Sequence, residues 1–363
     1  MGGMTPSPIL LTSPDDILGA VPYLLGFHPA ESLVVIAFSG RGARGELRVT
    51  TRWDLPAGPG AFDRLVPLLR RERVTHTIVA GFGAGTLVTP AVEEVLRLLR
   101  DAGIEVIEAL RADEARYWSY VCPRVECCPP EGRRYDPVAG RVAARATVDG
   151  LVALPGREEL RRSVRPVAGP ARKAMREATE LAASGVRSRL TGMAVPDEFP
   201  GLFVSEGLAR VRAAVGTSVA GGRLTDREAA SIGLDLAVIR IRDEAWTLIC
   251  DETENAHIAL WGDLTRRLEP RFVPPVASLL AAASWRHGDC ALAAMAVERA
   301  LAEDPTYSMA NLLAEGLRQL VSPTVLRDRM PTPRELATTM GPPRMSWLHP
   351  LLTLLDPPTP HPP

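Results

Sequence analysis

The chain has 363 residues, a length that suits two domains better than a single hydrophobic core. Hydrophobic residues make up 46% of the sequence and charged residues 23%, which is the balance of a soluble globular protein. The formal net charge is -1, so no overall positive field attracts nucleic acid or an anionic membrane, and we expect neither as a partner.

Nothing at the start of the sequence resembles an export signal. The opening residues, MGGMTPSPILL, lack a basic region followed by a long apolar segment and a small-residue cleavage site. No uninterrupted apolar run reaches the roughly 18 residues that a membrane helix needs. The chain has five cysteines, an odd number, which fits a reducing compartment. We therefore expect a cytoplasmic protein.

The first third of the sequence alternates strand and helix patterns. Ser13 and Pro14 mark a helix start, because serine caps a helix and proline fits its first position. Leu33–Phe38 is an unbroken apolar run, typical of a strand that is covered on both faces. Further strands are expected at Leu47–Trp53, Thr77–Phe82 and Ile104–Leu110, and further helices at Phe62–Arg73 and Pro90–Ala102. Two successive strand–helix–strand units predict an α/β domain over residues 9–135, with a mostly parallel sheet flanked by helices.

After about Tyr135 the strand patterns almost disappear and helical spacing replaces them up to residue 323. The clearest helix start is Thr225, which forms a capping-box pattern with Glu228. We therefore predict an all-helical domain over residues 136–323. Residues 324–363 are rich in proline and threonine and predict a largely disordered tail, in which Met345–Leu355 is an apolar island.

A polar loop before the first strand, in the stretch GFHPAES, carries one set of candidate site residues. His28, Glu31 and Ser32 supply an imidazole, a carboxylate and a hydroxyl, the groups of nucleophilic catalysis. Residues this close in one loop rarely point at one another, and the Gly-x-Ser-x-Gly nucleophile elbow is missing. The alternative is structural: His28 and Glu31 hydrogen-bond exposed backbone groups, and Pro29 stiffens the loop.

The stretch GFGAGT, Gly81 to Thr86, separates an expected strand from an expected helix. Glycines there can let backbone amides approach a phosphate at the start of a helix. However, the spacing differs from the dinucleotide-binding pattern, and the only lysine of the chain, Lys173, is far away in the sequence. The spacing favours a flexible turn.

Three of the five cysteines, Cys122, Cys127 and Cys128, fall within seven residues. Three thiolates plus a histidine or water can bind zinc, and a turn at Pro123 would let Cys122 pair with Cys127 on oxidation. Structural zinc sites usually have two pairs of cysteines, and the second pair is missing here. We therefore expect no stably bound metal and name no cofactor. Inert, redox-active and metal-linked roles all stay open.

Arginine dominates the basic residues, since Lys173 is the only lysine among 42. We attribute this excess to a GC-rich genome. The stretch Arg157–Arg189 carries nine basic residues but no aromatic one, so stacking on nucleic-acid bases is not expected. A solvated helix face explains it better.

The segment WRHGDCALAAMAVERALAEDPTYSMANLL resembles a tetratricopeptide repeat. Gly288, Ala293 and Ala300 stand at small-residue positions of that repeat, where they let two helices approach closely, and Pro305 ends the second helix. The expected helices are Val276–Arg286, Cys290–Leu301 and Ser308–Leu320. Because such repeats need neighbours to be stable, we expect this tetratricopeptide-like hairpin to pack on the preceding helices.

Three stretches together resemble one family: SPDDILGAVPYLLGFHPAESLVVIAF, then CPRVECCPPEG, then WRHGDCALAAMAVERALAEDP. On these stretches the chain is similar, over residues 10–323, to an actinobacterial family catalogued as domain of unknown function 4192. The resemblance implies a cytoplasmic bacterial protein. It implies no activity, substrate or catalytic residue.

Two classes of function fit these features. The hairpin and the lack of a strong catalytic motif favour a binding or scaffold protein whose helical domain contacts a protein partner; the sequence predicts no particular oligomeric state. The alternative is an enzyme or small-molecule binder with a site at the carboxyl edge of the sheet, near Cys122–Cys128. The loops after Phe38, Phe82 and Leu110 would line that site. A deep polar pocket there favours the alternative, and a hydrophobic helical groove favours the scaffold.

Overall fold

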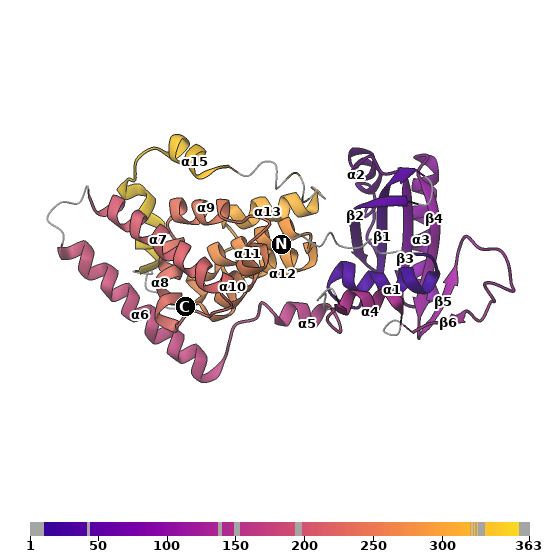
Figure 1. Ribbon diagram of the computed structural model, residues 1–363, viewed down its shortest axis with the longest axis horizontal. Helices are drawn as coiled ribbons and strands as arrows, with labels where there is room; N and C mark the ends of the chain where they lie inside the picture. The colour runs from indigo at the N-terminus through magenta and orange to yellow at the C-terminus, as the bar shows by residue number, and fades with distance from the viewer. Residues whose placement is uncertain are drawn as a thin grey trace. The chain divides into compact units, whose positions relative to one another are not determined.

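The computed structural model describes residues 11–41, 44–136, 140–148, 153–192, 198–319, 321, 323, 325 and 331–355. The chain forms two compact units, Met1–Leu160 and Arg161–Pro363. Among the described residues, all strands belong to the first unit and the second unit is built from helices (Figure 1).

The first unit is organised around a six-stranded sheet in the order β2-β1-β3-β4-β5-β6. The strands are β1 (Ser32–Arg41), β2 (Arg44–Asp54), β3 (His76–Phe82), β4 (Glu105–Asp113), β5 (Arg116–Ser119) and β6 (Arg133–Arg134). Only β3 and β4 pair in parallel, and every other pair is antiparallel. The α/β class with flanking helices is confirmed, but the prediction of a mostly parallel sheet is wrong.

The error has a topological cause. Both expected strand–helix–strand units exist, with α2 (Leu65–Arg71) between β2 and β3 and α3 (Gly85–Asp101) between β3 and β4. However, β1 forms a hairpin with β2 and also pairs antiparallel with β3, so it lies between two strands that share a direction. The first crossover therefore skips over β1, and only the second joins neighbouring parallel strands.

The apolar run of β1 forms the centre of the core. Leu33–Ala37 is fully buried, as expected of a strand covered on both faces. Leu33 and Val35 pack on one face with side chains of α2 and α3. Val34 and Ile36, which alternate with them, point to the other face and are also fully buried.

The helix α1 (Pro14–Leu25) begins and ends as its sequence predicts. The Ser13 hydroxyl accepts a hydrogen bond from the Asp16 N–H, and Gly26 ends the helix with a φ of 75°. The first unit extends past residue 135, where the composition changes, because α4 (Arg141–Val148) packs against α1. Arg141 Nη2 lies 3.1 Å from the buried carboxylate of Asp16.

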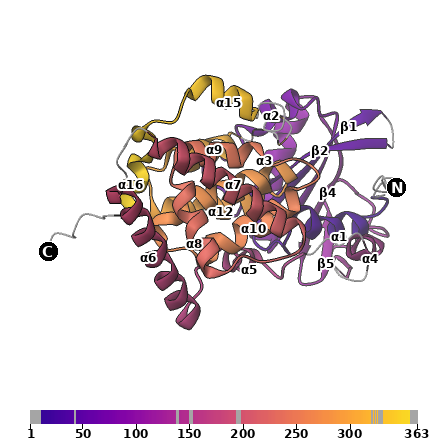
Figure 2. The ribbon, with the colours of Figure 1, turned by 60° about the vertical axis from the view of Figure 1, so that its left-hand side comes forward.

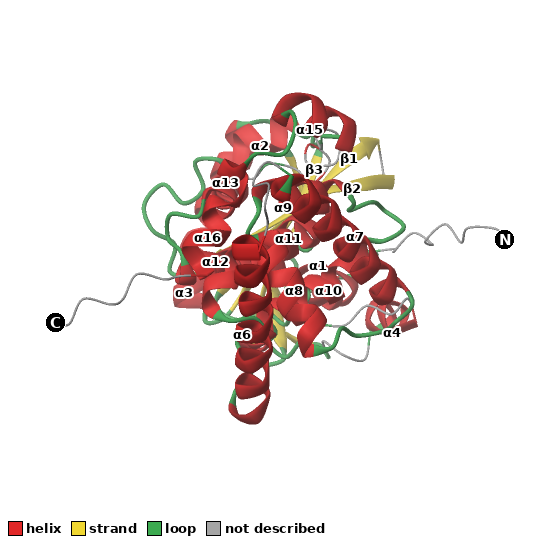
Figure 3. Cartoon of the chain, turned by 90° about the vertical axis from the view of Figure 1, so that its left-hand side faces the viewer, coloured by secondary structure: helices red, strands yellow, loops and turns green. Residues whose placement is uncertain are grey.

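The second unit is a layered helical structure. Its helices are α6 (Gly169–Gly192), α7 (Phe199–Val219), α8 (Asp226–Leu236), α9 (Ile239–Thr247), α10 (Glu254–Arg267), α11 (Val273–His287), α12 (Cys290–Glu303), α13 (Ser308–Arg318), α15 (Pro333–Met340) and α16 (His349–Leu355); α5 (Arg157–Arg162) contains the boundary between the units. Every residue from Val273 to Trp285 is buried, so α11 is the central helix, and it contacts α10, α12 and α13. The helix α6 runs along the outside of this unit (Figure 3).

Part of the expected tail is packed rather than exposed. A 3-10 helix at Met345–Leu348 contacts α7 and α9, and Leu348, Leu351 and Leu355 are all buried. The guanidinium of Arg187, on α6, donates to the carbonyl oxygen of Leu355, which places α16 beside α6 (Figure 2). Residues 324, 326–330 and 356–363 of that tail lie outside the described residues.

No helix in the described part of the chain combines the length and the apolar character that crossing a membrane requires.

Candidate functional site

The first unit has a pocket at the edge of the sheet where β3 and β4 end. Its volume is about 460 Å³, the largest of the three cavities described here. It is lined by Pro29, Ala30, Glu31, Phe82, Gly83, Ala84, Leu87, Ala112, Asp113, Glu114 and Tyr135. We call it the edge pocket.

The direction of β1 decides which loops reach this pocket. Ser32, the first residue of β1, pairs with Phe82, the last residue of β3, and Phe82 pairs with Ala112 near the end of β4. The loop before β1 therefore meets the ends of β3 and β4. The loop after Phe38, which a parallel sheet would have placed here, lies at the opposite edge, where Phe38 pairs with His76.

The rim of the edge pocket is acidic. Glu31, Asp113 and Glu114 contribute three carboxylates, and the lining includes no lysine, arginine or histidine. One guanidinium lies beside the lining residues: Arg111 Nη1 is 3.5 Å from Asp113 Oδ2 and also hydrogen-bonds the Gly83 carbonyl. Burial and, next, the negative charge of Asp113 raise the pKa of Tyr135. The hydroxyl of Tyr135 is thus neutral and able to donate a hydrogen bond.

Strained backbone gathers at this pocket. Glu31 and Glu114 have φ values of 44° and 45°, and Ala115, next to Glu114, has a φ of 58°. Glu114 and Ala115 form the two-residue turn between β4 and β5, a position where Asn-Gly is the favoured pair. Such conformations cost about 1–3 kcal/mol each and concentrate at ligand sites.

Two glycines of the GFGAGT stretch have defined structural roles beside the pocket. A Cβ atom on Gly81 would lie 2.1 Å from Val88 Cγ1, so glycine is required for α3 to pack on β3. Gly83 has a φ of 126°, which a side chain would disfavour. No side chain caps α3 at Ala84, so the first N–H groups of the helix are left for other acceptors.

The three residues of the GFHPAES loop do not form a catalytic triad. Ser32 is fully buried, and its hydroxyl donates to the Ala30 carbonyl at 2.5 Å and accepts from Arg52 Nη2 at 2.6 Å. The half-buried His28 uses its backbone N–H to bond the Leu154 carbonyl. Within the described hydrogen bonds, none joins the side chains of His28, Glu31 and Ser32. Of the three, only Glu31 lines the pocket.

The three cysteines do come together. The sulfur atoms of Cys122, Cys127 and Cys128 all lie within 4.8 Å of one another, and all three thiols are free. A hydrogen bond from the Arg124 N–H and, next, one from Cys128 lower the pKa of Cys122. Burial raises the pKa of Cys128 to about 12. Among the described residues the cluster includes no histidine, so His28 is not part of it.

The cysteine cluster and the edge pocket are separated by β5. This strand starts at Arg116, opposite Asp113 at the pocket, and runs antiparallel to β4 until Ser119 pairs with Leu110. The cysteines follow Ser119, so β5 carries them away from the pocket. Neither site contributes a residue to the other.

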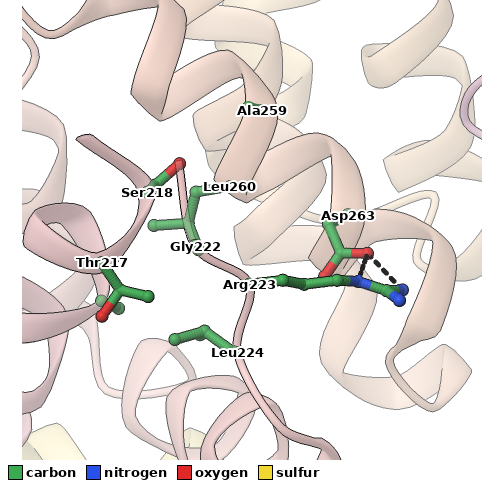
Figure 4. Close-up of a pocket in the computed structure, with 9 residues that line it drawn as sticks. Thr217, Ser218, Gly222, Arg223, Leu224, Ala259, Leu260 and Asp263 are labelled. Atoms are coloured by element: carbon green, nitrogen blue, oxygen red, sulfur yellow. Dashed lines mark hydrogen bonds and ion pairs between the residues drawn. The ribbon is translucent and has the colours of Figure 1, made fainter. Parts of the chain in front are cut away.

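The helical unit contains two smaller cavities. One, of about 220 Å³, lies between the end of α7 and α10. Arg223 and Asp263 both line this cavity and form an ion pair, with Arg223 Nη2 2.7 Å from Asp263 Oδ1 (Figure 4). The other, of about 180 Å³, includes the buried Asp235 in its wall. The ion pairs in both walls join neighbouring segments of the unit, so we assign them structural roles.

Taken together, these features define a two-unit protein: a mixed α/β unit with an acidic edge pocket and a cysteine cluster, and a helical unit. The chain belongs to the family described as Domain of unknown function (DUF4192), whose pattern matches residues 14–324. This match confirms the resemblance to domain of unknown function 4192 that the sequence indicated. No curated protein and no solved structure matches the chain.

Proposed function

We propose that this protein binds a small organic molecule with a cationic amine in the edge pocket. The observation that carries the proposal is that three acidic residues, Glu31, Asp113 and Glu114, line one cavity of about 460 Å³. This volume lies within the roughly 300–1,000 Å³ that small-molecule sites occupy.

The pocket offers complementary groups for both ends of such a ligand. An ammonium group can form charge-assisted hydrogen bonds to Glu31 and Glu114, and the Tyr135 ring can face the cation. Ala84 and Leu87, at the start of α3, line another part of the wall. The positive end of a helix attracts an oxygen atom there. An amine joined to a carboxylate or carbonyl group therefore suits the pocket best.

The chemistry supports binding rather than catalysis. The only hydroxyl in the GFHPAES loop, that of Ser32, is buried and engaged in two hydrogen bonds. The positive φ values of Glu31 and Glu114 support a fixed backbone beneath these two residues, so little main-chain entropy is lost when a ligand binds.

The test is a thermal-unfolding screen of the full chain with small amines, amino acids and matched carboxylic acids without an amine, followed by calorimetric titration of the hits. Amine-bearing compounds should raise the unfolding temperature. Glu31→Gln and Glu114→Gln should each weaken binding about tenfold or more, because each removes a charged acceptor. Glu94→Gln, at an exposed position of α3, is the matched control and should change nothing.

Two results would refute the proposal. In the first, no amine binds. In the second, the double variant of Glu31 and Glu114 binds amines as tightly as the native chain. If only the carboxylic acids without an amine bind, the binding site would instead be assigned to the start of α3.

We propose contact with a protein partner through the helical unit as a second function. The supporting observation is the pair α11 and α12, in which Ala293 and Ala300 are fully buried, as in a tetratricopeptide-like hairpin. Stacked repeats of this kind bind partners on an extended concave surface. Leu312 on α13 is 63% exposed. Leu312→Asp should abolish co-purification of any partner, whereas Leu181→Asp, at a 65% exposed leucine of α6, should not.

A further inference from the structure

The sulfur atoms of Cys122, Cys127 and Cys128 have the spacing of a metal site that lacks only its ion. They all lie within 4.8 Å of one another. In a tetrahedral zinc site with bonds of about 2.3 Å, the sulfur atoms are about 3.8 Å apart. A small contraction of the cluster is therefore enough to bring the three thiolates onto one ion.

Backbone hydrogen bonds hold the cysteines in this arrangement. The N–H groups of Cys127 and Cys128 both donate to the Arg124 carbonyl, at 3.1 and 2.7 Å. The Cys122 N–H donates to Ser119 Oγ at 3.1 Å, and that hydroxyl donates to Glu108 Oε1 at 2.8 Å. The turn is thus tied to β4, and the sulfur positions do not depend on the sulfurs bonding to one another.

The rest of the loop is anchored on β5. Trp118 Nε1 donates to the Pro130 carbonyl at 2.9 Å, and the Arg111 guanidinium stacks on the Trp118 ring at 3.6 Å. Gly132 lies so close to Trp118 that a Cβ atom would be 2.5 Å from the ring. Because these contacts fix the loop, the three cysteines are held in place before a metal ion binds.

The two other interpretations of the cluster fit the structure less well. Inert cysteines are among the most buried residue types, whereas Cys127 is exposed and Cys122 and Cys128 are half-buried. A disulfide would use two sulfurs and leave the third without a role. Cys127 and Cys128 are neighbours in sequence, where a disulfide strains the peptide that joins them.

We propose that Cys122, Cys127 and Cys128 form a three-thiolate site for Zn²⁺ whose fourth position is open to water or an external ligand. No histidine or carboxylate within the described ranges completes the set, and an open fourth position distinguishes reactive zinc sites from closed structural ones. This inference does not depend on the edge pocket. It replaces the sequence-based expectation of no stable metal, which rested on the missing second cysteine pair.

When Zn²⁺ binds, it replaces the protons of the cysteine thiols. Each sulfur binds as a thiolate, so every ligand that is a thiol in the free protein transfers its proton to solvent. The three S–H bonds are replaced by three S–Zn bonds, no electrons are transferred, and the product carries one net negative charge.

The test is titration of the reduced, chelator-treated full chain with Co²⁺, followed by displacement with Zn²⁺. The expected result is one equivalent of Co²⁺ with thiolate-to-cobalt charge-transfer absorption, which one equivalent of Zn²⁺ removes. Cys122→Ser, Cys127→Ser and Cys128→Ser should each weaken binding at least about tenfold. Cys250→Ser and Cys290→Ser are matched controls in the second unit and should bind like the native chain.

Cys127→Ser is the decisive variant, because its side chain is exposed and the change should leave the fold intact by circular dichroism. Three outcomes would overturn the proposal: no charge-transfer absorption, the same absorption in the triple serine variant, or equal and free reaction of all three thiols in the presence of Zn²⁺. A native chain that forms a Cys122–Cys127 disulfide and binds no Co²⁺ after reduction would also overturn it.

Discussion

Arg210 on α7 and Asp235 on α8 form a two-pronged ion pair in the helical unit. Arg210 Nε lies 2.8 Å from Oδ2 of Asp235, and Nη2 lies 2.7 Å from Oδ1. The Asp235 side chain is 2% exposed, whereas that of Arg210 is 37% exposed. A charge as buried as that of Asp235 is tolerated only with a partner of this geometry.

Removing one partner of this pair should destabilise the second unit. Arg210→Ala leaves the Asp235 carboxylate buried without its counter-charge, and we expect a loss of about 3–5 kcal/mol in the free energy of unfolding by denaturant. Arg227→Ala, at an exposed position of α8, is the control and should cost less than about 0.5 kcal/mol. Adding Asp235→Leu to Arg210→Ala should recover part of the loss; a purely additive double variant would contradict this account.

His257 should make stability depend on pH. Its Nδ1 accepts from Trp261 Nε1 and its Nε2 donates to the Leu248 carbonyl, both at 3.1 Å, so the ring is neutral. Burial lowers its pKa from 6.5 to about 4. The unfolded chain takes up a proton below pH 6.5 and the folded chain only below pH 4. The neutral His257 side chain therefore contributes about 3 kcal/mol to the free energy of unfolding. This contribution is fully present above pH 6.5 and is lost as the pH falls to 4.

The matching variant is His257→Gln, whose amide can donate to Leu248 and accept from Trp261 but does not titrate in this range. Urea unfolding measured at intervals from pH 7 to pH 4 should show a shallower loss of stability in this variant than in the native chain. Equal slopes would assign the acid sensitivity to other groups.

Ala115→Gly should stabilise the first unit. Ala115 has a φ of 58° in the turn between β4 and β5, a conformation that glycine adopts without a steric penalty. Relief of this penalty should raise the free energy of unfolding by about 1 kcal/mol. Part of that gain is offset because glycine also gives the unfolded chain more conformational freedom. Ala144→Gly, within α4, is the opposite control and should destabilise the chain. A decrease in thermal stability for Ala115→Gly would mean that the turn is not strained.

Leu351→Ala should destabilise the second unit although it lies near the end of the chain. Leu351 is fully buried, so truncation leaves a cavity that costs about 2–4 kcal/mol. Leu352→Ala, one position along α16 and partly exposed, should cost clearly less. Equal effects in thermal unfolding would contradict the packing of α16 on this unit.

The short-range features of this protein follow from its sequence. Ser13 and Pro14 mark the start of α1, and Thr225 and Glu228 form the predicted capping box of α8, with both hydrogen bonds present. These signals are readable because the interacting groups lie within four residues of each other. The grouping of Cys122, Cys127 and Cys128 is of the same kind, since a single turn around Arg124 brings them together.

Strand order and direction are decided by the tertiary structure. The apolar run of β1 predicts a buried strand but not whether its neighbours run parallel or antiparallel, because both arrangements bury the same side chains. The pairing of β1 with both β2 and β3 places Glu31 beside Asp113 and Glu114, which lie more than 80 residues further along the chain. An acidic pocket made from such distant residues exists only once long-range strand pairing has brought their loops to one edge of the sheet.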